Sequence, residues 1–185
     1  MGKSDLDDYA DAVAGMKTLP FVDPGRIGIW GSSYGGTLTV FSLLKKPGLF
    51  QAGVAAAPAV DPRYYGSDDV AITRTPATHP EVFDQGRAVL YVAGLQDPLL
   101  ILHGMADDVV PFQTSVVFVQ ALVKARKRFE FAFTPTATHA WASKEDDALY
   151  LYGRLVDFLE RWIPPGPRDQ PTSRPDTSAP PAGLR

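Results

Sequence analysis

The sequence predicts an α/β fold with a mostly parallel sheet that is covered by helices on both faces. Short apolar segments that suit buried strands alternate along the chain with longer segments of helical periodicity. Strands in such an alternation pair in parallel, because each helix returns the chain to the same end of the sheet. Of the 185 residues, 45% are hydrophobic and 21% are charged, which is the balance of a globular protein with one core.

The first half of the chain predicts two helices and two strands. Apolar residues at helical spacing, behind a polar start, indicate a helix over residues 4–18. After a turn at Asp23, Pro24 and Gly25, the short apolar segment 26–30 suits a buried strand. A glycine-rich corner follows and leads into a helix over residues 37–45. The small apolar residues 52–57 form the second predicted strand.

The second half predicts strands over residues 99–102 and 129–134, each followed by a helix, over residues 111–127 and 143–162. The inward faces of these helices are expected to carry the apolar residues Phe112, Val116, Val119 and Val123 in the first, and Leu149, Tyr152, Leu155 and Leu159 in the second.

Two segments do not fit the alternation. Residues 61–97 mix Pro, Tyr, Gly and Asp, and are too long for a plain connection, so they predict a functional excursion or a lid, with a short helix over residues 80–85. Residues 164–185 hold seven prolines and almost no apolar bulk, which predicts a disordered tail. We therefore expect one domain over residues 1–163.

Composition excludes several classes of function. The net charge is −3 and the basic residues are scattered, which argues against nucleic acid and anionic membranes as partners. Without cysteine there is no disulfide, no thiolate metal site and no cysteine nucleophile. No apolar run approaches the roughly 18 residues of a membrane helix, and the polar N-terminus shows no signal peptide. The compartment stays unknown, with the cytoplasm as the default.

The glycine-rich corner carries the pattern Gly-x-Ser-x-Gly in Gly31, Ser33 and Gly35, between a predicted strand and a predicted helix. In a nucleophile elbow the glycines allow a tight strand-to-helix turn that presents the serine at the carboxyl end of the sheet. An ordinary serine in a glycine-rich turn would give the same pattern. Ser32 is the rival nucleophile, but it lies outside the symmetric glycine frame.

A serine hydroxyl needs a base, and the chain has three histidines. His139 follows the last predicted strand, which is its place in the chain order Ser, Asp, His of α/β-hydrolases. His79 and His103 are expected to be structural. The acid that orients His139 should follow the third strand, where Asp107 and Asp108 stand together, and their spacing does not separate them.

These segments resemble the catalytic domain of the prolyl oligopeptidase family, above all its dipeptidyl peptidase IV and acylaminoacyl peptidase branches. The likeness rests on residues 30–36, on residues 102–115 and on His139 with Ala140 and Trp141, and it extends almost to Pro164. It implies an α/β-hydrolase fold and a serine peptidase that cleaves peptides after proline or a small residue. In the family the first aspartate of the acid loop is catalytic, which favours Asp107.

The resemblance also implies substrate contacts. The backbone N–H of Tyr34 would stabilise the oxyanion, Tyr64 and Tyr65 would wall the pocket, and Val109 and Val110 would lie beside the substrate. Ordinary packing of the tyrosine pair is the alternative. Val109 departs from the family, because dipeptidyl peptidases carry a substrate-binding asparagine at that place.

The resemblance leaves three functions open: the peptidase, a carboxylesterase with the same triad, and a silent partial domain that acts by association. No metal or cofactor is implied. An α/β-hydrolase core has about eight strands, and only four are expected here, so the N-terminal strands would be missing. An open edge at residues 26–30 would then favour self-association.

Overall fold

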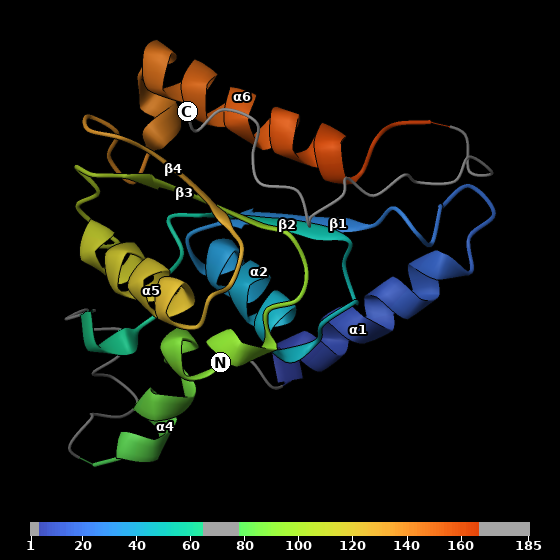
Figure 1. The fold of residues 1–185 in the computed structure, drawn as a ribbon, viewed down its shortest axis with the longest axis horizontal. Helices are drawn as coiled ribbons and strands as arrows, with labels where there is room; N and C mark the ends of the chain where they lie inside the picture. Colours follow the sequence, from blue (N-terminus) through green and yellow to red (C-terminus); the bar gives the residue numbers. More distant parts are fainter. Residues whose placement is uncertain (1–3, 65–77, 167–185) are drawn as a thin grey trace.

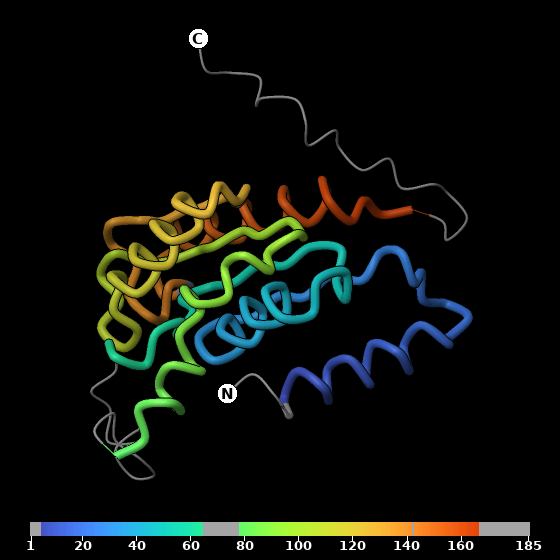
Figure 2. Tube along the Cα trace, turned by 60° about the horizontal axis from the view of Figure 1, so that its bottom comes forward, coloured from blue at the N-terminus to red at the C-terminus, as the bar shows by residue number. Residues whose placement is uncertain are grey.

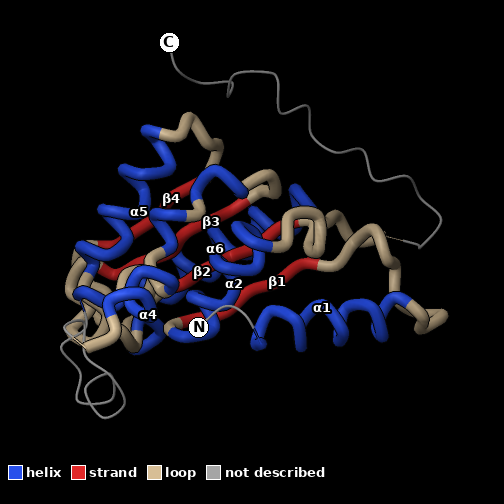
Figure 3. The backbone as a smooth tube through the Cα atoms, turned by 90° about the horizontal axis from the view of Figure 1, so that it is seen from below, coloured by secondary structure: helices blue, strands red, loops and turns tan. Residues whose placement is uncertain are grey.

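The computed structural model describes residues 4–64 and 78–166 (Figure 1). Its centre is a sheet of four parallel strands in the order β1-β2-β3-β4. The strands are β1 (Gly28–Ser32), β2 (Ala52–Ala56), β3 (Leu99–Gly104) and β4 (Glu130–Thr134). They lie side by side in chain order (Figure 3). The predicted parallel sheet is confirmed.

Helices cover both faces of this sheet (Figures 1 and 2). α1 (Ser4–Lys17), α2 (Tyr34–Lys45) and α5 (Phe112–Lys124) lie on one face. α6 (Glu145–Trp162) packs against the other, together with Trp141 of the turn η4 (Trp141–Ser143) that precedes it. Because side chains alternate along a strand, each strand feeds both layers. The central strands β2 and β3 are buried along their whole length.

Two boundaries differ from the prediction at the glycine-rich corner. β1 lies two residues later than expected, and α2 begins at Tyr34, three residues before the predicted start. Gly35 and Gly36 are therefore part of the first turn of the helix. As a result Ser33 is the single residue between strand and helix.

The predicted inward face of the last helix was wrong in part. Leu151, Leu155 and Phe158 are buried on α6, whereas Leu149 is 66% exposed and Tyr152 is 43% exposed. The buried residues are spaced i, i+4 and i+7, which forms one stripe toward the sheet.

The face of α5 was also wrong in part. Its buried residues are Thr114, Ser115, Phe118 and Leu122. Val116 and Val123, which were expected inward, are exposed. Polar side chains with hydrogen-bond partners therefore occupy the side that faces the sheet.

The irregular segment is anchored at its two described ends. η1 (Pro62–Tyr64) opens it, and α4 (Pro80–Gln85), η2 (Ala88–Leu90) and η3 (Val92–Gly94) close it. The helix predicted over residues 80–85 is thus confirmed. Residues 65–77 lie outside the described chain, so the lid stays a prediction.

A buried carboxylate joins these two ends. Asp61 accepts hydrogen bonds from Arg63 and lies 3.6 Å from Nε of Arg87. Burial opposes ionisation of Asp61, but the hydrogen bonds and charge of Arg63, with Arg87 beyond, hold its pKa below the ordinary value. The ion pairs therefore fix where the segment leaves β2 and where it returns.

The described residues also bear on membrane-spanning helices and on the predicted tail. None of the described helices combines the length and the apolar character that crossing a bilayer requires. Most of the predicted tail, residues 167–185, falls outside the described residues, so its disorder stays a prediction.

Candidate active site

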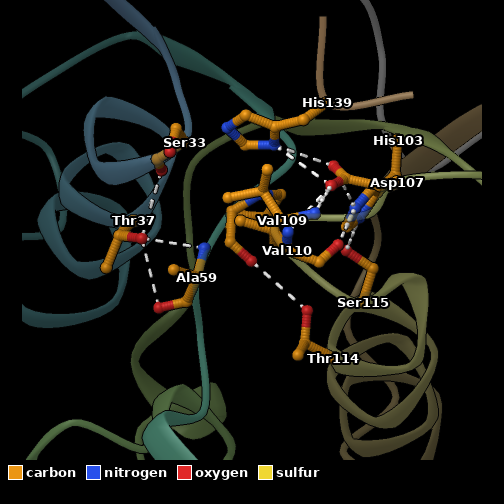
Figure 4. A network of polar contacts seen from close by, with 11 residues as sticks. Ser33, Thr37, Ala59, His103, Asp107, Val109, Val110, Thr114, Ser115 and His139 are labelled. Carbon is orange, nitrogen blue, oxygen red and sulfur yellow. Dashed lines mark hydrogen bonds and ion pairs between the residues drawn. The ribbon is translucent and has the colours of Figure 1, made fainter. Parts of the chain in front are cut away.

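Three segments that the sequence analysis singled out end at the same edge of the sheet. Ser33 follows β1, Asp107 lies in the loop after β3, and His139 follows β4. In a parallel sheet the carboxyl ends of all strands meet at one edge, where ligands of open α/β sheets bind. Figure 4 shows these side chains gathered there.

Ser33 occupies a strained turn. Its φ of 58° and ψ of −122° lie outside the regions that non-glycine residues favour. A Cβ on Gly31 would lie 2.5 Å from the backbone of Gly35, and one on Gly36 would lie 2.5 Å from the carbonyl oxygen of Ala56. Glycine is thus required where the turn folds back on itself and where α2 approaches β2. Ser32, the rival nucleophile, is part of β1 and pairs with Ala56.

Thr37 supports the turn from within α2. Its Oγ1 lies 3.2 Å from the carbonyl oxygen of Ser33 and 3.1 Å from that of Ala59, and it accepts the N–H of Ala59 at 2.8 Å. With one proton, the hydroxyl donates to one carbonyl at a time. Thr37 was not identified from the sequence, because a threonine in a helix gives no sign of its hydrogen-bond partner.

Tyr34 is the first residue of α2, so its N–H has no acceptor within the helix. The positive end of the helix dipole lies at the same place, which favours a negative charge beside Ser33. The phenol of Tyr34 is half exposed and donates to Asp5 Oδ2 at 3.3 Å. Partial burial and the negative charge of Asp5 raise the pKa of Tyr34.

Asp107, not Asp108, contacts the histidine. Oδ2 and Oδ1 of Asp107 lie 3.0 and 3.2 Å from Nδ1 of His139. The Asp107 side chain is fully buried, while the His139 side chain is 23% exposed. Asp108 is exposed. The two candidates that sequence spacing left equal are therefore distinguished by geometry.

Two backbone N–H groups donate hydrogen bonds to one oxygen of the Asp107 carboxylate. Oδ1 accepts from Val109 at 2.9 Å and from Val110 at 2.8 Å. The side chain of Val109 is 59% exposed, whereas Val110 is buried. Of the valine pair, only Val109 therefore presents its side chain to solvent.

His103, which was expected to be an ordinary structural histidine, touches the same carboxylate. Its Nε2 lies 3.2 Å from Asp107 Oδ2 and 3.0 Å from the carbonyl oxygen of Val110. Its Nδ1 lies 2.8 Å from Oγ of Ser115. Burial lowers the pKa of His103, despite the opposing effects of Val110 and Asp107. The spacing of four residues to Asp107 is the one sequence feature that pointed to this contact.

The described side chains of Ser33 and His139 are not joined by a hydrogen bond. In Figure 4 the ring of His139 stands between Ser33 and Asp107, with its second nitrogen on the side of Ser33. Contacts between a nucleophile and its base are often long without substrate and shorten when it binds. His139 is thus held through Nδ1 by Asp107, and its other ring nitrogen lies toward Ser33.

Of the remaining predicted residues, some lie within the described part of the chain and one lies outside it. Tyr64 ends η1 and is 36% exposed. Tyr65 lies outside the described residues. His79 precedes α4 and contacts the Thr78 hydroxyl. Across the described ranges, no group of three or more His, Asp or Glu side chains is placed to hold a metal ion.

Comparison with known proteins shows the family of this chain. Residues 1–165 match the prolyl oligopeptidase family. The probable dipeptidyl-aminopeptidase B of Fusarium vanettenii is 32% identical over 170 residues, which are 88% of this chain and 18% of that protein. Mouse prolyl endopeptidase FAP is 30% identical over 165 residues, 87% of this chain and 22% of that protein. The chain thus spans about a fifth of the length of these relatives.

Solved structures share the fold. Porphyromonas gingivalis dipeptidyl peptidase 4 superposes with a TM-score of 0.80 at 37% identity, over 86% of this chain and 23% of that one. Pyrococcus horikoshii acylaminoacyl peptidase gives 0.78 at 25% identity, over 88% of this chain and 28% of that one. The fold is therefore a part of an α/β-hydrolase domain, and the chain belongs to the prolyl oligopeptidase family.

Proposed function

We propose that this chain is a serine peptidase that cleaves peptide bonds after proline or a small residue through an acyl-enzyme. Ser33 is the nucleophile, His139 the general base and Asp107 the acid that orients it. The observation that carries the proposal is the contact of His139 Nδ1 with the buried Asp107 carboxylate, 3.0 Å away, beside the strained turn of Ser33.

The contact between His139 and Asp107 supports the following path for the proton. Asp107 is an acceptor only, so it holds the proton of His139 on Nδ1 and leaves a lone pair on Nε2. Nε2 accepts the proton of Ser33 as its oxygen forms a bond to the carbonyl carbon. The same proton then passes to the leaving amine as the peptide bond breaks. Water, activated by Nε2 in turn, hydrolyses the ester and restores Ser33.

The oxyanion of each tetrahedral intermediate forms next to the start of α2. The unpaired N–H of Tyr34 is the donor that this chain supplies. The helix dipole adds to its effect, because the N-terminus carries a partial positive charge.

The substrate class rests on the relatives and on two side chains. The names of the relatives include prolyl endopeptidase and dipeptidyl-aminopeptidase. Tyr64 is the described member of the aromatic pair expected to hold a proline ring, and Val109 is exposed next to Asp107. An apolar valine cannot supply the hydrogen bonds of an asparagine, so the proposal does not extend to the release of dipeptides.

A fluorophosphonate probe tests the nucleophile. We expect the full chain to be labelled at Ser33, and Ser33→Ala to abolish the labelling. Ser32→Ala is the matched control and should retain most of it, since Ser32 lies within β1. Labelling that survives Ser33→Ala would overturn the assignment, and an unlabelled folded chain would favour a catalytically silent domain.

A second experiment separates peptidase from esterase, which share the triad. Rates of hydrolysis are compared for a prolyl amide and a short-chain ester with the same leaving-group chromophore. The proposal expects turnover of the amide that depends on Ser33. Turnover of the ester alone would identify a carboxylesterase instead.

A further inference from the structure

His103 and His139 bind one carboxylate from different elements. His139 follows β4, and His103 is the fifth residue of β3. Both contact Oδ2 of Asp107, at 3.0 and 3.2 Å. The side chains of His103 and Asp107 are fully buried. The proposed function uses only His139, so a second buried imidazole on the same oxygen has no role in it.

The contacts of His103 define its tautomer. Nε2 faces two acceptors, the carbonyl oxygen of Val110 and the carboxylate of Asp107, so it carries the proton. Nδ1 then has a lone pair, and it accepts the hydroxyl proton of Ser115 at 2.8 Å. Of the two neutral tautomers, only this one gives both ring nitrogens a partner.

The surroundings of the ring favour its neutral form. Phe112 packs edge-on against it, with the ring centroids 5.4 Å apart. The titratable groups that act on it are Asp107, in contact, and His139 beyond it. Burial lowers the pKa of His103, so the ring stays a neutral donor while His139 exchanges its proton.

We infer that His103 is a positioning residue for Asp107, which it holds on the side away from His139 as a neutral Nε2–H donor backed by Ser115. The inference rests on the proposed function, because it assigns His103 an effect on the base of that reaction. The donor fixes the plane of the carboxylate and draws part of its charge away from His139.

This role predicts a pH effect that packing alone does not produce. Without the His103 donor, more of the Asp107 charge acts on His139 and favours its protonated form. The acidic limb of the rate profile should then move to higher pH. A variant that merely loosened the core would label slowly at every pH without moving the limb.

The test measures the rate of fluorophosphonate labelling of Ser33 against pH in four proteins. His103→Leu should label about 10- to 100-fold more slowly at neutral pH, as for loss of a hydrogen bond to a charged group, with the acidic limb shifted upward. His103→Gln keeps an N–H at its ε position and should restore most of the rate and the wild-type limb. His79→Leu is the matched control and should leave both unchanged, because the hydrogen-bonding contact described for His79 is with the neighbouring Thr78 hydroxyl.

Imidazole nitrogen NMR keeps the inference testable if His103→Leu fails to fold. In the wild-type chain, labelled with ¹⁵N at histidine, His103 should be the Nε2–H tautomer at neutral pH and should take up a second proton only at a lower pH than a free histidine. A proton on Nδ1 at neutral pH, or titration at the value of a free histidine, would overturn the inference.

Asp107→Asn separates failure of this inference from failure of the proposed function. If Asp107→Asn labels slowly while His103→Leu behaves as wild type, the role of His103 is wrong and the triad stands. If Asp107→Asn labels at the wild-type rate, the proposed function itself is wrong.

Discussion

The carbonyl oxygen of Ala56 accepts the backbone N–H of Ser33 at 2.9 Å. This bond attaches the strained serine to the neighbouring strand β2. The same carbonyl oxygen lies where a side chain on Gly36 would begin, 2.5 Å from its Cβ. One peptide group therefore holds the turn and limits the size of the residue that packs over it.

Gly36→Ala should destabilise the fold by about 1–3 kcal/mol, as for overpacking of a tight core site. The new methyl group would push on the carbonyl that holds Ser33, so labelling of Ser33 should slow as well. Gly35→Ala is the matched control, because a Cβ there meets nothing within 4 Å. Thermal unfolding of both variants checks this, and equal destabilisation would contradict it.

Asp107→Asn should lower the rate of Ser33 labelling by roughly 10⁴, because an amide can hold the wrong tautomer of His139. Asp108→Asn removes an exposed carboxylate and should change the rate less than about tenfold. Labelling kinetics at pH 7.5 compare the two. A larger effect at Asp108 would assign the acid to the wrong residue.

Stability should fall as the pH drops below about 6.5, the ordinary pKa of histidine. The folded pKa of His103 lies below that value because the ring is buried. Between the two values the unfolded chain binds the proton and the folded chain does not, so the free energy of unfolding rises with pH in this window. Urea unfolding at pH 5.5 and 7.5 measures the slope.

The variant His103→Gln provides the control, since it lacks the titrating group. Its free energy of unfolding should change less between the two pH values than that of the wild type. An identical change in both proteins would mean that other groups cause the effect.

Much of the site could be predicted because a tight turn and the end of a strand each require particular residue types close together in the sequence. The strained turn of Ser33 needs small neighbours, and the strand ends that carry Asp107 and His139 follow from the alternation of strands and helices. Thr37, His103 and Ser115 were not identified this way, because their roles depend on hydrogen-bond partners that the sequence pattern does not name, even where Asp107 lies only four residues from His103. The face of α5 was misjudged for the same reason. Ser115 is buried since it meets His103, whereas periodicity alone assigns a serine to the solvent.

We propose that the open edge of β1 pairs with a second copy of the chain. Ile27 and Ser33 bond toward β2, so the alternate residues of the parallel strand, Gly28, Trp30 and Ser32, direct their backbone groups outward. No other described strand pairs there. α1 runs nearby (Figure 3), yet Trp30 is 50% exposed. The strand has no charge, proline or bulge to discourage pairing.

Trp30→Pro tests this edge, because proline removes only an outward N–H and adds bulk against a partner strand. We expect the wild type to associate with rising concentration in sedimentation experiments and Trp30→Pro to remain monomeric. Trp30→Thr removes the indole but keeps the N–H and should associate at least in part. A wild-type chain that stays monomeric at high concentration would refute the proposal.

Ser33 and His139 belong to opposite margins of the sheet, after β1 and after β4. Three strand spacings of about 4.8 Å separate those margins, roughly 14 Å in all. The loop after β4 therefore carries its imidazole inward across the strand ends to the neighbourhood of the serine. Labelling of Ser33 should therefore report on assembly of the whole sheet. A partly folded chain that lacks either margin keeps each sequence motif but does not place Ser33 beside His139.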